Sequence, residues 1–536
     1  MENNNKNTFI AIGLMLLVWV VFTVVFPPTQ EPSVEQPPAD EATRTEVVAS
    51  SSSSPAQDVA SIPTIIPVVS TEEKELLIKT DLYSAVLTNI GARVKLLELN
   101  DYHVENDPDS DLVRIIDVSM PHQASLRLAG VNGLLLSPEA PYSLPEEKEI
   151  VLSSDQEKSI TLSTRTSDGL LIEKVMTFRG NSYAVDVVIR VSNPGQVATR
   201  GGLEFSLVQV FDDSAKPDRL SFVGGAALVN DEVQTASLDD LAEESVSYGK
   251  ATVWTAYEDK YFMSALVPLE NALEKVRIQR QDERVENIIS LPGTSLSPGS
   301  STTHTFMAYF GPRDMKVLEQ VNHQLSKAID FGFFSIISDP LLWFLNFINT
   351  YVHNYGIAII LLTVLIKTLF WPLTHKSYAS MKAMQKLQPE IAKIRERFKN
   401  DRTRQGQETM EMYKKHRVNP MSGCLPMLIQ IPVFFALYRV LYEAIELRHA
   451  DFAFWLTDLS AKDPYYITPV VMGVTMFIQQ RMTPSTMDPT QQKIFLAMPV
   501  VFTALFLNFP SGLVIYWLIN NLLTIAQQYY IHKKFS

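Results

Sequence analysis

One lysine stands out among the residues that could do chemistry, because it lies where a charge is costly. The stretch GIAIILLTVLIKTLFWPLTHKS, residues 356–377, contains an apolar run long enough to cross a bilayer, and Lys367 interrupts that run. A lysine at the centre of a membrane span costs roughly 2.5–3.5 kcal/mol on insertion scales. The side chain must therefore reach water at a membrane surface, or water must reach the side chain in a polar recess.

Both interpretations of Lys367 fit the sequence. Pro372 follows about five residues later, roughly 7 Å along a helix, and a lysine stem can extend that far to the surface. A buried functional charge would instead need polar neighbours from other spans. The best candidates for such neighbours are Thr363, Gln430 and Asn520, and the span that holds Asn520 also holds Asn521, Thr524 and Gln527.

The chain shows no recognisable catalytic or metal-binding motif. The patterns G-x-S-x-G, H-E-x-x-H and G-x-x-x-x-G-K-[ST] do not occur in the sequence. Cys424 is the single cysteine, so no intramolecular disulfide can form, and no Cys/His cluster is available for zinc or iron. We therefore predict no catalytic residue, no metal and no cofactor; that the protein is not an enzyme is implied by the family resemblance given below.

Several apolar runs predict a polytopic membrane protein with six transmembrane helices. Residues 1–26 are expected to form an uncleaved anchor, because no small-residue cleavage pattern follows the apolar run. Five more spans are expected within residues 351–536: the one that contains Lys367, and runs at about 421–444, 465–480, 494–508 and 511–530. Residues 326–350 are apolar but broken by acids and a proline, which favours an amphipathic helix in the membrane interface.

The residues between the anchor and the later spans divide into two parts. Residues 27–62 are rich in Pro, Ser and Glu, so we expect a disordered linker. From residue 63 to 325 the pattern changes to period two, as in NSYAVDVVIRVSN, where Val185, Val187 and Ile189 share one face and Asp186 and Arg190 the other. This pattern predicts an all-β sandwich domain that packs and contacts partners.

The distribution of charge predicts an orientation in the membrane. The formal net charge is −13, but acids gather in residues 27–330, whereas Lys and Arg outnumber acids in residues 331–536. The loop at 373–419 is basic and the loop at 446–464 is net acidic, so the first is expected in the cytoplasm and the second outside. Both termini are then cytoplasmic, and the β domain lies in the periplasm of a bacterium with two membranes.

The basic loop at 373–419 has a helical pattern of its own. Apolar residues recur at helical spacing in SYASMKAMQKLQPEIAKIRERF, KNDRTRQGQ interrupts the pattern, and ETMEMYKKHRV fits a shorter return helix. We expect a cytoplasmic helical hairpin. It could be a plain connector, or its positive charge could attract a ribosome, a nascent chain or anionic lipid.

Several motifs carry a family resemblance. VNPMSGCLPMLIQIPVFFALY, DPYYITPVVMGVTMFIQQRMTP, DPTQQKIF and FPSGLVIYWLINNLLTIAQQ together resemble the YidC/Oxa/Alb family of membrane-protein insertases, and IKTDLYSAVLTNIGARV resembles the start of the large periplasmic domain of its Gram-negative members. The resemblance implies that this domain is a β-supersandwich. It also implies a protein that inserts newly made proteins into the bacterial inner membrane, alone or with the Sec translocon, and helps them fold.

The resemblance implies a site as well. Family members enclose a hydrophilic groove that opens to the cytoplasm and the inner leaflet and holds one cation, and Lys367 occupies that position, where arginine is more usual. Lysine keeps the charge but lacks the planar fork that binds a carboxylate with two bonds. Ile431, Phe434, Tyr516 and Trp517 match family positions that touch substrate on a lipid-facing slide, although ordinary helix packing explains them almost as well. The SecDF accessory complex and membrane lipids are further implied partners.

Two other functions fit parts of the sequence. A secondary transporter would also place a lysine among polar helix residues, but it would usually show repeated halves, and none is visible. A membrane-anchored periplasmic carbohydrate-processing protein would explain the β domain but not the later spans. Three histidines of that domain, His103, His122 and His304, are scattered without a visible carboxylate partner.

Overall fold

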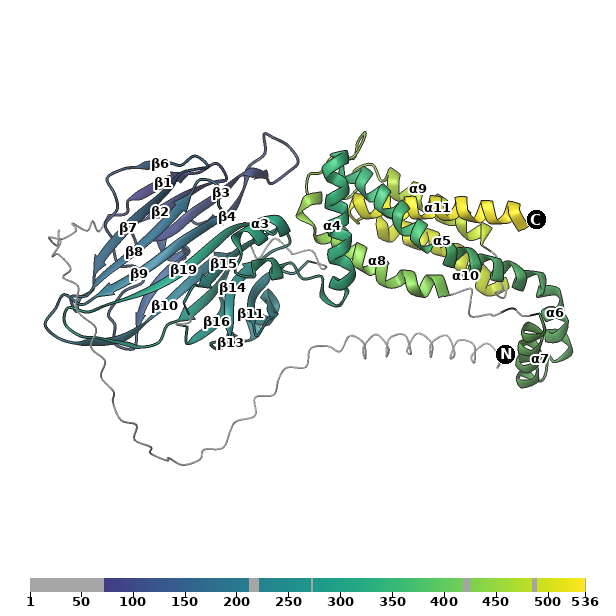
Figure 1. The fold of residues 1–536 in the computed structure, drawn as a ribbon, viewed down its shortest axis with the longest axis horizontal. Helices are drawn as coiled ribbons and strands as arrows, with labels where there is room; N and C mark the ends of the chain where they lie inside the picture. The colour runs from purple at the N-terminus through teal and green to yellow at the C-terminus, as the bar shows by residue number, and fades with distance from the viewer. Residues whose placement is uncertain are drawn as a thin grey trace, which may run out of the picture. The chain divides into compact units, whose positions relative to one another are not determined.

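The computed structural model describes residues 72–211, 221–270, 273–416, 418, 425–483 and 489–535 of the chain. The predicted anchor at 1–26 and the predicted linker at 27–62 lie outside the described residues, as does the start of the predicted β domain. The described chain consists mainly of strands as far as Pro312 and of helices from Met315 onward (Figure 1).

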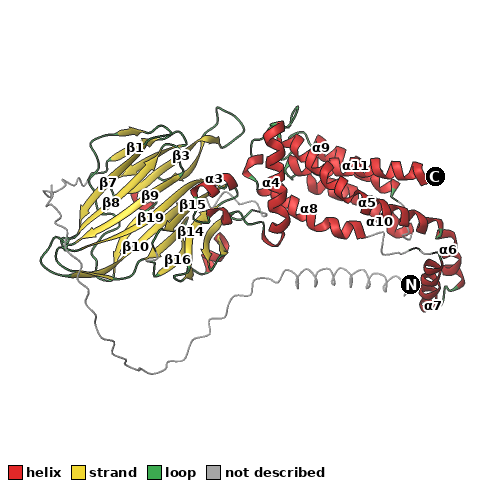
Figure 2. Ribbon diagram, in the orientation of Figure 1, coloured by secondary structure: helices red, strands yellow, loops and turns green. Residues whose placement is uncertain are grey.

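The described strands, yellow in Figure 2, form three sheets. Every strand pair is antiparallel except β1 with β6, which is parallel. The five-stranded sheet has the order β4 (Leu112–Asp117), β3 (Arg93–His103), β2 (Tyr83–Thr88), β1 (Glu75–Lys79), β6 (Glu149–Val151). The six-stranded sheet has the order β13 (Val246–Tyr248), β16 (Lys275–Gln281), β17 (Arg284–Ser290), β10 (Thr199–Val210), β18 (Thr294–Leu296), and β5 (Arg127–Val131) also pairs with β10. The eight-stranded sheet has the order β12 (Glu232–Ser237), β11 (Gly224–Val229), β14 (Thr252–Glu258), β15 (Phe262–Pro268), β19 (Ser301–Pro312), β9 (Ala184–Ser192), β8 (Leu171–Arg179), β7 (Glu157–Arg165).

The predicted period-two pattern is confirmed in β9. Val185, Val187 and Ile189 are buried, Asp186 is half-buried and Arg190 is exposed. A strand places successive side chains on opposite faces, so its apolar residues enter the core while the polar ones stay outside. The same alternation recurs along β8.

The core of the β domain contains two basic side chains. The Nζ atom of Lys174 donates hydrogen bonds to the carbonyl oxygens of Ala92 at 2.7 Å and Leu126 at 2.6 Å. Arg93, also buried, donates to the carbonyl oxygen of Pro121 at 3.0 Å. Burial lowers the pKa of Lys174 well below its ordinary value of 10.5. Backbone carbonyls thus accept hydrogen bonds from both basic side chains, and removal of either side chain would leave buried acceptors unpaired.

Helices and the loops that connect them make up the rest of the described chain. They are α3 (Met315–Val321), α4 (Ser335–Val352), α5 (Tyr355–Lys386), α6 (Gln388–Arg397), α7 (Arg402–Lys415), α8 (Leu425–Glu443), α9 (Ile467–Met482), α10 (Pro489–Phe506) and α11 (Ser511–Phe535), and a short α2 (Leu238–Glu243) lies within the β domain. Asn354 begins α5, because its side-chain oxygen accepts a hydrogen bond from the backbone N–H of Ile357 at 2.9 Å.

The predicted boundaries of the helical hairpin are wrong in two places. The predicted first helix is divided, since α5 continues to Lys386 and α6 starts at Gln388 with a proline in its first turn, where proline is tolerated. The predicted break at KNDRTRQGQ is shorter than expected. Asp401 caps α7 by accepting a hydrogen bond from the backbone N–H of Arg404 at 3.0 Å, so the helix begins at Arg402.

The segment predicted as one interfacial helix at 326–350 is also divided. Short 3₁₀ turns at Leu325–Ala328 and Gly332–Phe334 precede α4. Gly332 has a φ of +66°, a backbone conformation that favours glycine. The Asp330 carboxylate accepts a hydrogen bond from the backbone N–H of Gly332 at 2.8 Å. This turn ends the first part of the segment, and the long helix begins only at Ser335.

One of the described helices, α5, is long and apolar enough to cross a membrane by its length and composition. A shorter apolar segment occupies Phe495–Phe506 in α10. The predicted count of six spans therefore remains a prediction.

The helices pack in a fixed order around an apolar cluster. The α11 helix packs beside α5 and α9, α10 packs beside α9, and α4 packs beside α5 and α8. Figure 1 shows α4 next to the starts of α5 and α11 and the end of α8. The largest apolar contribution to the cluster comes from the first half of α5, the second half of α8 and the first turns of α11. Its buried members on these three helices are Ala358, Ile359, Leu362, Ile366, Leu437, Val440, Leu441, Leu513, Val514, Ile515 and Tyr516.

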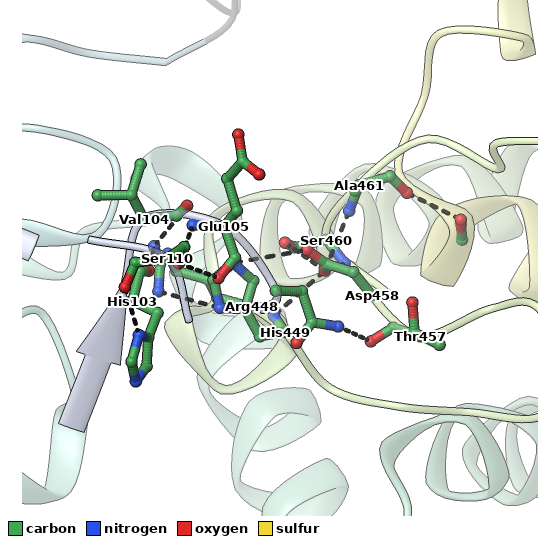
Figure 3. A network of polar contacts seen from close by, with 12 residues as sticks. His103, Val104, Glu105, Ser110, Arg448, His449, Thr457, Asp458, Ser460 and Ala461 are labelled. Carbon is green, nitrogen blue, oxygen red and sulfur yellow. Dashed lines mark hydrogen bonds and ion pairs between the residues drawn. The ribbon is translucent and has the colours of Figure 1, made fainter. Parts of the chain in front are cut away.

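The loop between α8 and α9, residues 444–466, covers the starts of α5 and α11, and we call it the cap loop. Its Ala461 carbonyl accepts a hydrogen bond from the Ser511 N–H at 2.7 Å, and its Phe452 carbonyl accepts one from the Asn354 side chain at 2.9 Å. Figure 3 shows the Asp458 carboxylate facing Ser460 and Ala461 of the same loop. The loop is therefore a folded element that places the first residues of α5 and α11 at one end of the bundle.

The cap loop also contacts the β domain. Figure 3 shows the Arg448 guanidinium reaching the end of β3, where it donates hydrogen bonds to the carbonyls of His103, the last residue of the strand, and, at 3.3 Å, of Val104. The Asn106 side chain donates a hydrogen bond to the Thr457 carbonyl at 2.5 Å.

Candidate functional site

The interface between α5 and α11 changes character along its length. Near the cap loop it is apolar, with Ile359 and Leu362 from α5 and Leu513 and Val514 from α11. Beyond Ile366 polar contacts join the two helices, and the rings of Trp371 and Tyr530 also meet there with centroids 6.2 Å apart. The two helices run in the same direction from the cap loop, so the polar half lies toward the hairpin formed by α6 and α7.

Lys367 is the first residue of the polar half. Its side chain is partly buried, and its Nζ atom donates a hydrogen bond to Thr524 Oγ1 of α11 at 2.9 Å. Among the residues that the structure describes, no Asp or Glu forms an ion pair with Lys367. The ammonium group therefore has a neutral partner, and its charge is not compensated by an acid of the described chain.

Two other predicted residues join Lys367 through Thr524. The Gln430 side chain of α8 donates a hydrogen bond to Asn520 Oδ1 of α11 at 3.1 Å. Thr524 Oγ1 in turn donates to the backbone carbonyl of Asn520 at 2.7 Å. The structure thus brings Lys367, Gln430 and Asn520 into one hydrogen-bonded group on α5, α8 and α11.

Thr363 is not part of this group. It is buried one helical turn before Lys367, and its hydroxyl donates a hydrogen bond to the Ile359 carbonyl of its own helix at 2.6 Å. Within the described residues no hydrogen bond joins Thr363 to Lys367. Thr363 and Lys367 lie on the same face of α5, as helical spacing predicts. The Thr363 hydroxyl proton, however, is used in the hydrogen bond to the Ile359 carbonyl.

Further polar contacts continue the group toward the hairpin. Gln527 Nε2 donates a hydrogen bond to Thr374 Oγ1 of α5 at 2.7 Å. Gln528 Nε2 donates to Tyr378 Oη of α5 and to Thr483 Oγ1 after α9, both at 2.9 Å. The sequence prediction named Thr524 and Gln527 as further polar residues of this span, behind Thr363, Gln430 and Asn520, and did not name Gln528. The repeat of polar residues every seven positions, Asn520 with Gln527 and Asn521 with Gln528, is the signal that could have found this face of α11.

The residues predicted to line a lipid-facing slide divide into two kinds. Ile431 is 42% exposed, and the Phe434 and Trp517 rings meet edge to face with centroids 4.9 Å apart. Tyr516 is only 2% exposed and lies in the apolar cluster, so its predicted position on the lipid-facing side is wrong. The physical reason is the turn of α11, which points Tyr516 into the bundle and leaves Trp517 at its edge.

The described residues contain no group of three or more His, Cys, Asp or Glu side chains placed to hold a metal ion. The polar half of the bundle instead offers amides, hydroxyls and the Lys367 ammonium group. Such a set can hold water and attract anions, which is a physical task rather than a covalent one.

Two family models match consecutive parts of the chain. The model described as 60Kd inner membrane protein matches residues 347–536, and the model described as YidC periplasmic domain matches residues 75–344. The chain is 41% identical over 540 residues to the membrane protein insertase YidC of Geobacter metallireducens, which covers 99% of both chains.

The chain belongs to the YidC family. It is 42% identical over 534 residues to the YidC insertase of Geotalea uraniireducens, covering 98% of this chain and 99% of that one. The protein is therefore a membrane protein insertase with a β-rich domain, as the sequence motifs predicted. The alternatives of a transporter and a carbohydrate-processing protein are not favoured.

Solved structures give weaker likenesses. A YidC insertase crystal structure with its first transmembrane domain resolved has a TM-score of 0.36 and 19% sequence identity, covering 87% of this chain and 94% of that one. A galactose mutarotase related enzyme from Lactobacillus acidophilus has a TM-score of 0.33 and 10% identity, covering 44% of this chain and 97% of that one.

Proposed function

We propose that the polar half of the bundle is the recess through which this YidC insertase transfers part of a client into the membrane, with Lys367 as the charge that attracts the client. The observation that carries this proposal is the partly buried Lys367 ammonium, which has a hydroxyl partner but no acidic partner in the described chain. The polar side chains around it would keep the recess hydrated, and no covalent step is required.

The electrostatic argument favours clients with acidic tails. Two opposite charges 4 Å apart attract by about 4 kcal/mol at an effective dielectric constant of 20, against about 1 kcal/mol in water. An unpaired charge within a protein is unfavourable, so a client carboxylate that approaches Lys367 relieves a cost as well as gaining attraction. A recess that reaches partway through the membrane also shortens the dry path that the tail must cross.

The proposal includes a topology. Lys367 lies in the half of the bundle next to α6 and α7, so the recess would open to the cytoplasm and to the inner leaflet of the bacterial inner membrane. The N-terminal anchor and five later helices would span that membrane, with both termini in the cytoplasm and the β domain in the periplasm. The α4 helix would lie in the membrane interface, because Trp343 and Tyr351 are exposed on it at 63% and 72%.

Partners follow from the same arrangement. Nascent membrane proteins are the clients, and Ile431, Phe434 and Trp517 would contact a segment that moves from the recess into lipid. The hairpin is held by Leu387, Ile391 and Met412, and its basic surface would face the ribosome or anionic lipid. The β domain would serve contacts with the Sec translocon and the SecDF complex.

The test is insertion of a single-span client with an acidic periplasmic tail into proteoliposomes that contain only this protein. Lys367→Ala and Lys367→Glu should abolish most insertion, whereas Lys367→Arg should retain it because it keeps the charge. Lys376→Ala is the matched control, since Lys376 is an exposed lysine on the same helix. Equal insertion by wild type and all Lys367 variants would overturn the proposed role of Lys367.

A further inference from the structure

The Thr524 hydroxyl lies between the Lys367 ammonium group and the Asn520 carbonyl in the proposed recess. Its oxygen accepts the hydrogen bond from Lys367 Nζ at 2.9 Å and donates to the Asn520 carbonyl at 2.7 Å. The Thr524 residue is only 4% exposed. A threonine hydroxyl has one proton, and here that proton is used on the Asn520 carbonyl, so toward Lys367 the oxygen acts as an acceptor.

The hydrogen bond to Asn520 also fixes the direction of the Thr524 oxygen. It runs from residue i to the carbonyl of residue i−4 in the same helix, a bond that holds the threonine side chain in one rotamer. Donation to the carbonyl polarises the hydroxyl and strengthens it as an acceptor. The Thr524 oxygen is therefore a hydrogen-bond acceptor with a fixed position relative to the Lys367 ammonium group.

The positions of Lys367 and Thr524 along their helices show in which direction the lysine side chain extends. Lys367 lies about 18 Å along α5 from Tyr355, and Thr524 lies about 20 Å along α11 from Ser511, at 1.5 Å per residue. The two helices start side by side beneath the cap loop. The lysine stem consequently extends sideways across the interface to a partner at its own level, rather than along α5 toward the membrane surface.

The hydroxyl of Thr524 is an uncharged partner, so it does not neutralise the positive charge of Lys367. An aspartate or glutamate at position 524 would pair with Lys367 and cancel its field. A hydroxyl satisfies one of the three ammonium protons and leaves the positive charge available.

We propose that Thr524 is a positioning residue of the insertase, which holds the Lys367 ammonium inside the recess and prevents it from extending to the membrane surface. This inference rests on the proposed function of Lys367. Thr524 itself need not touch the client, and its effect is transmitted through the place of the lysine charge.

The test compares two versions of the same single-span client in proteoliposomes, one with an acidic periplasmic tail and one in which the acids are replaced by their amides. Thr524→Val keeps the shape and removes the acceptor, and it should lower insertion of the acidic client about tenfold, equivalent to about 1.4 kcal/mol, while sparing the amide client. Thr524→Ser should retain most of the insertion because it keeps the hydroxyl. The matched control is Thr368→Val, an exposed threonine of α5 whose hydroxyl donates to the Val364 carbonyl of its own helix.

A double variant separates positioning from a general structural role. In the Lys367→Ala background, Thr524→Val should cause no further loss, because there is no ammonium left to hold. Full insertion by Thr524→Val while Lys367→Ala loses insertion would overturn the role of Thr524 alone. Equal loss for both clients, or an additive loss in the double variant, would also overturn it. If Lys367→Ala inserts normally, the proposed function fails and this inference fails with it.

Discussion

Asp463 of the cap loop provides the most quantitative prediction. Its side chain is 1% exposed and accepts four hydrogen bonds. Oδ1 accepts from Trp455 Nε1 at 3.1 Å and from the Tyr465 N–H at 2.9 Å, and Oδ2 accepts from the Thr468 N–H and hydroxyl, both at 2.7 Å. The carboxylate therefore ties the end of the cap loop to the first turn of α9, where a negative charge is also favoured by the helix dipole.

Asp463→Asn keeps the size of this side chain but replaces one acceptor by a donor. In the better of its two orientations the amide nitrogen faces Thr468, whose hydroxyl can rotate to accept but whose backbone N–H cannot. One buried donor is then unpaired, which costs about 1–3 kcal/mol, and the remaining hydrogen bonds lose the strengthening effect of a charged acceptor. We expect a loss of about 2–4 kcal/mol in the stability of the helical bundle.

The dependence on pH gives a second measure of the same contact. Burial opposes ionisation of Asp463, but hydrogen bonds from Thr468, Tyr465 and Trp455 outweigh it and hold its pKa below the ordinary value of 3.8. Stability from a lowered acid pKa is complete above the unfolded value and disappears as the pH falls through the folded value. The difference between wild type and Asp463→Asn should therefore be constant above pH 3.8 and shrink below it.

The assay is thermal unfolding of the full chain in detergent, followed by circular dichroism and tryptophan fluorescence at several pH values. Asp451→Asn serves as the matched control, because Asp451 is an exposed acid of the same loop. If Asp463→Asn unfolds at the wild-type temperature at neutral pH, the four hydrogen bonds do not stabilise the bundle and the reasoning is refuted.

Three further predictions concern other contacts. Gly473→Ala should destabilise the α9–α10 packing by about 1–3 kcal/mol, because a Cβ atom there would lie 1.9 Å from Thr503 Oγ1, and adding Thr503→Ala should restore part of the lost thermal stability. Lys174→Met should lower the unfolding temperature, with a cost of about 1–3 kcal/mol for carbonyls left unpaired, whereas Lys158→Met at an exposed position should not. Gln527→Leu should reduce insertion of an acidic client, because an apolar side chain dries the recess. Unfolding in detergent should change little, because the Thr374 hydroxyl that Gln527 contacts keeps its hydrogen bonds to carbonyls of its own helix; an equal fall in both quantities would contradict this.

Local patterns were enough to predict several features of this chain. The alternation in β9 follows from the period of a strand, and the apolar run around Lys367 follows from composition alone. The motifs also predicted the YidC family, which the comparisons confirmed. The predicted starts of two helices were wrong, because capping and turn geometry override apolar spacing there. The side-chain hydrogen bond of Asp401 sets the start of α7, and the positive φ of Gly332 belongs to the turn that precedes α4.

The sequence by itself determined which residues share a face of a helix, and so it placed Asn520, Thr524 and Gln527 together on α11. It could not determine how that face is rotated toward α5, because the rotation depends on the packing of every helix in the bundle. Only the tertiary structure brought Lys367 to Thr524, directed Gln430 to Asn520 and turned Tyr516 into the apolar cluster. These are contacts between residues far apart in the chain, and no local pattern encodes them.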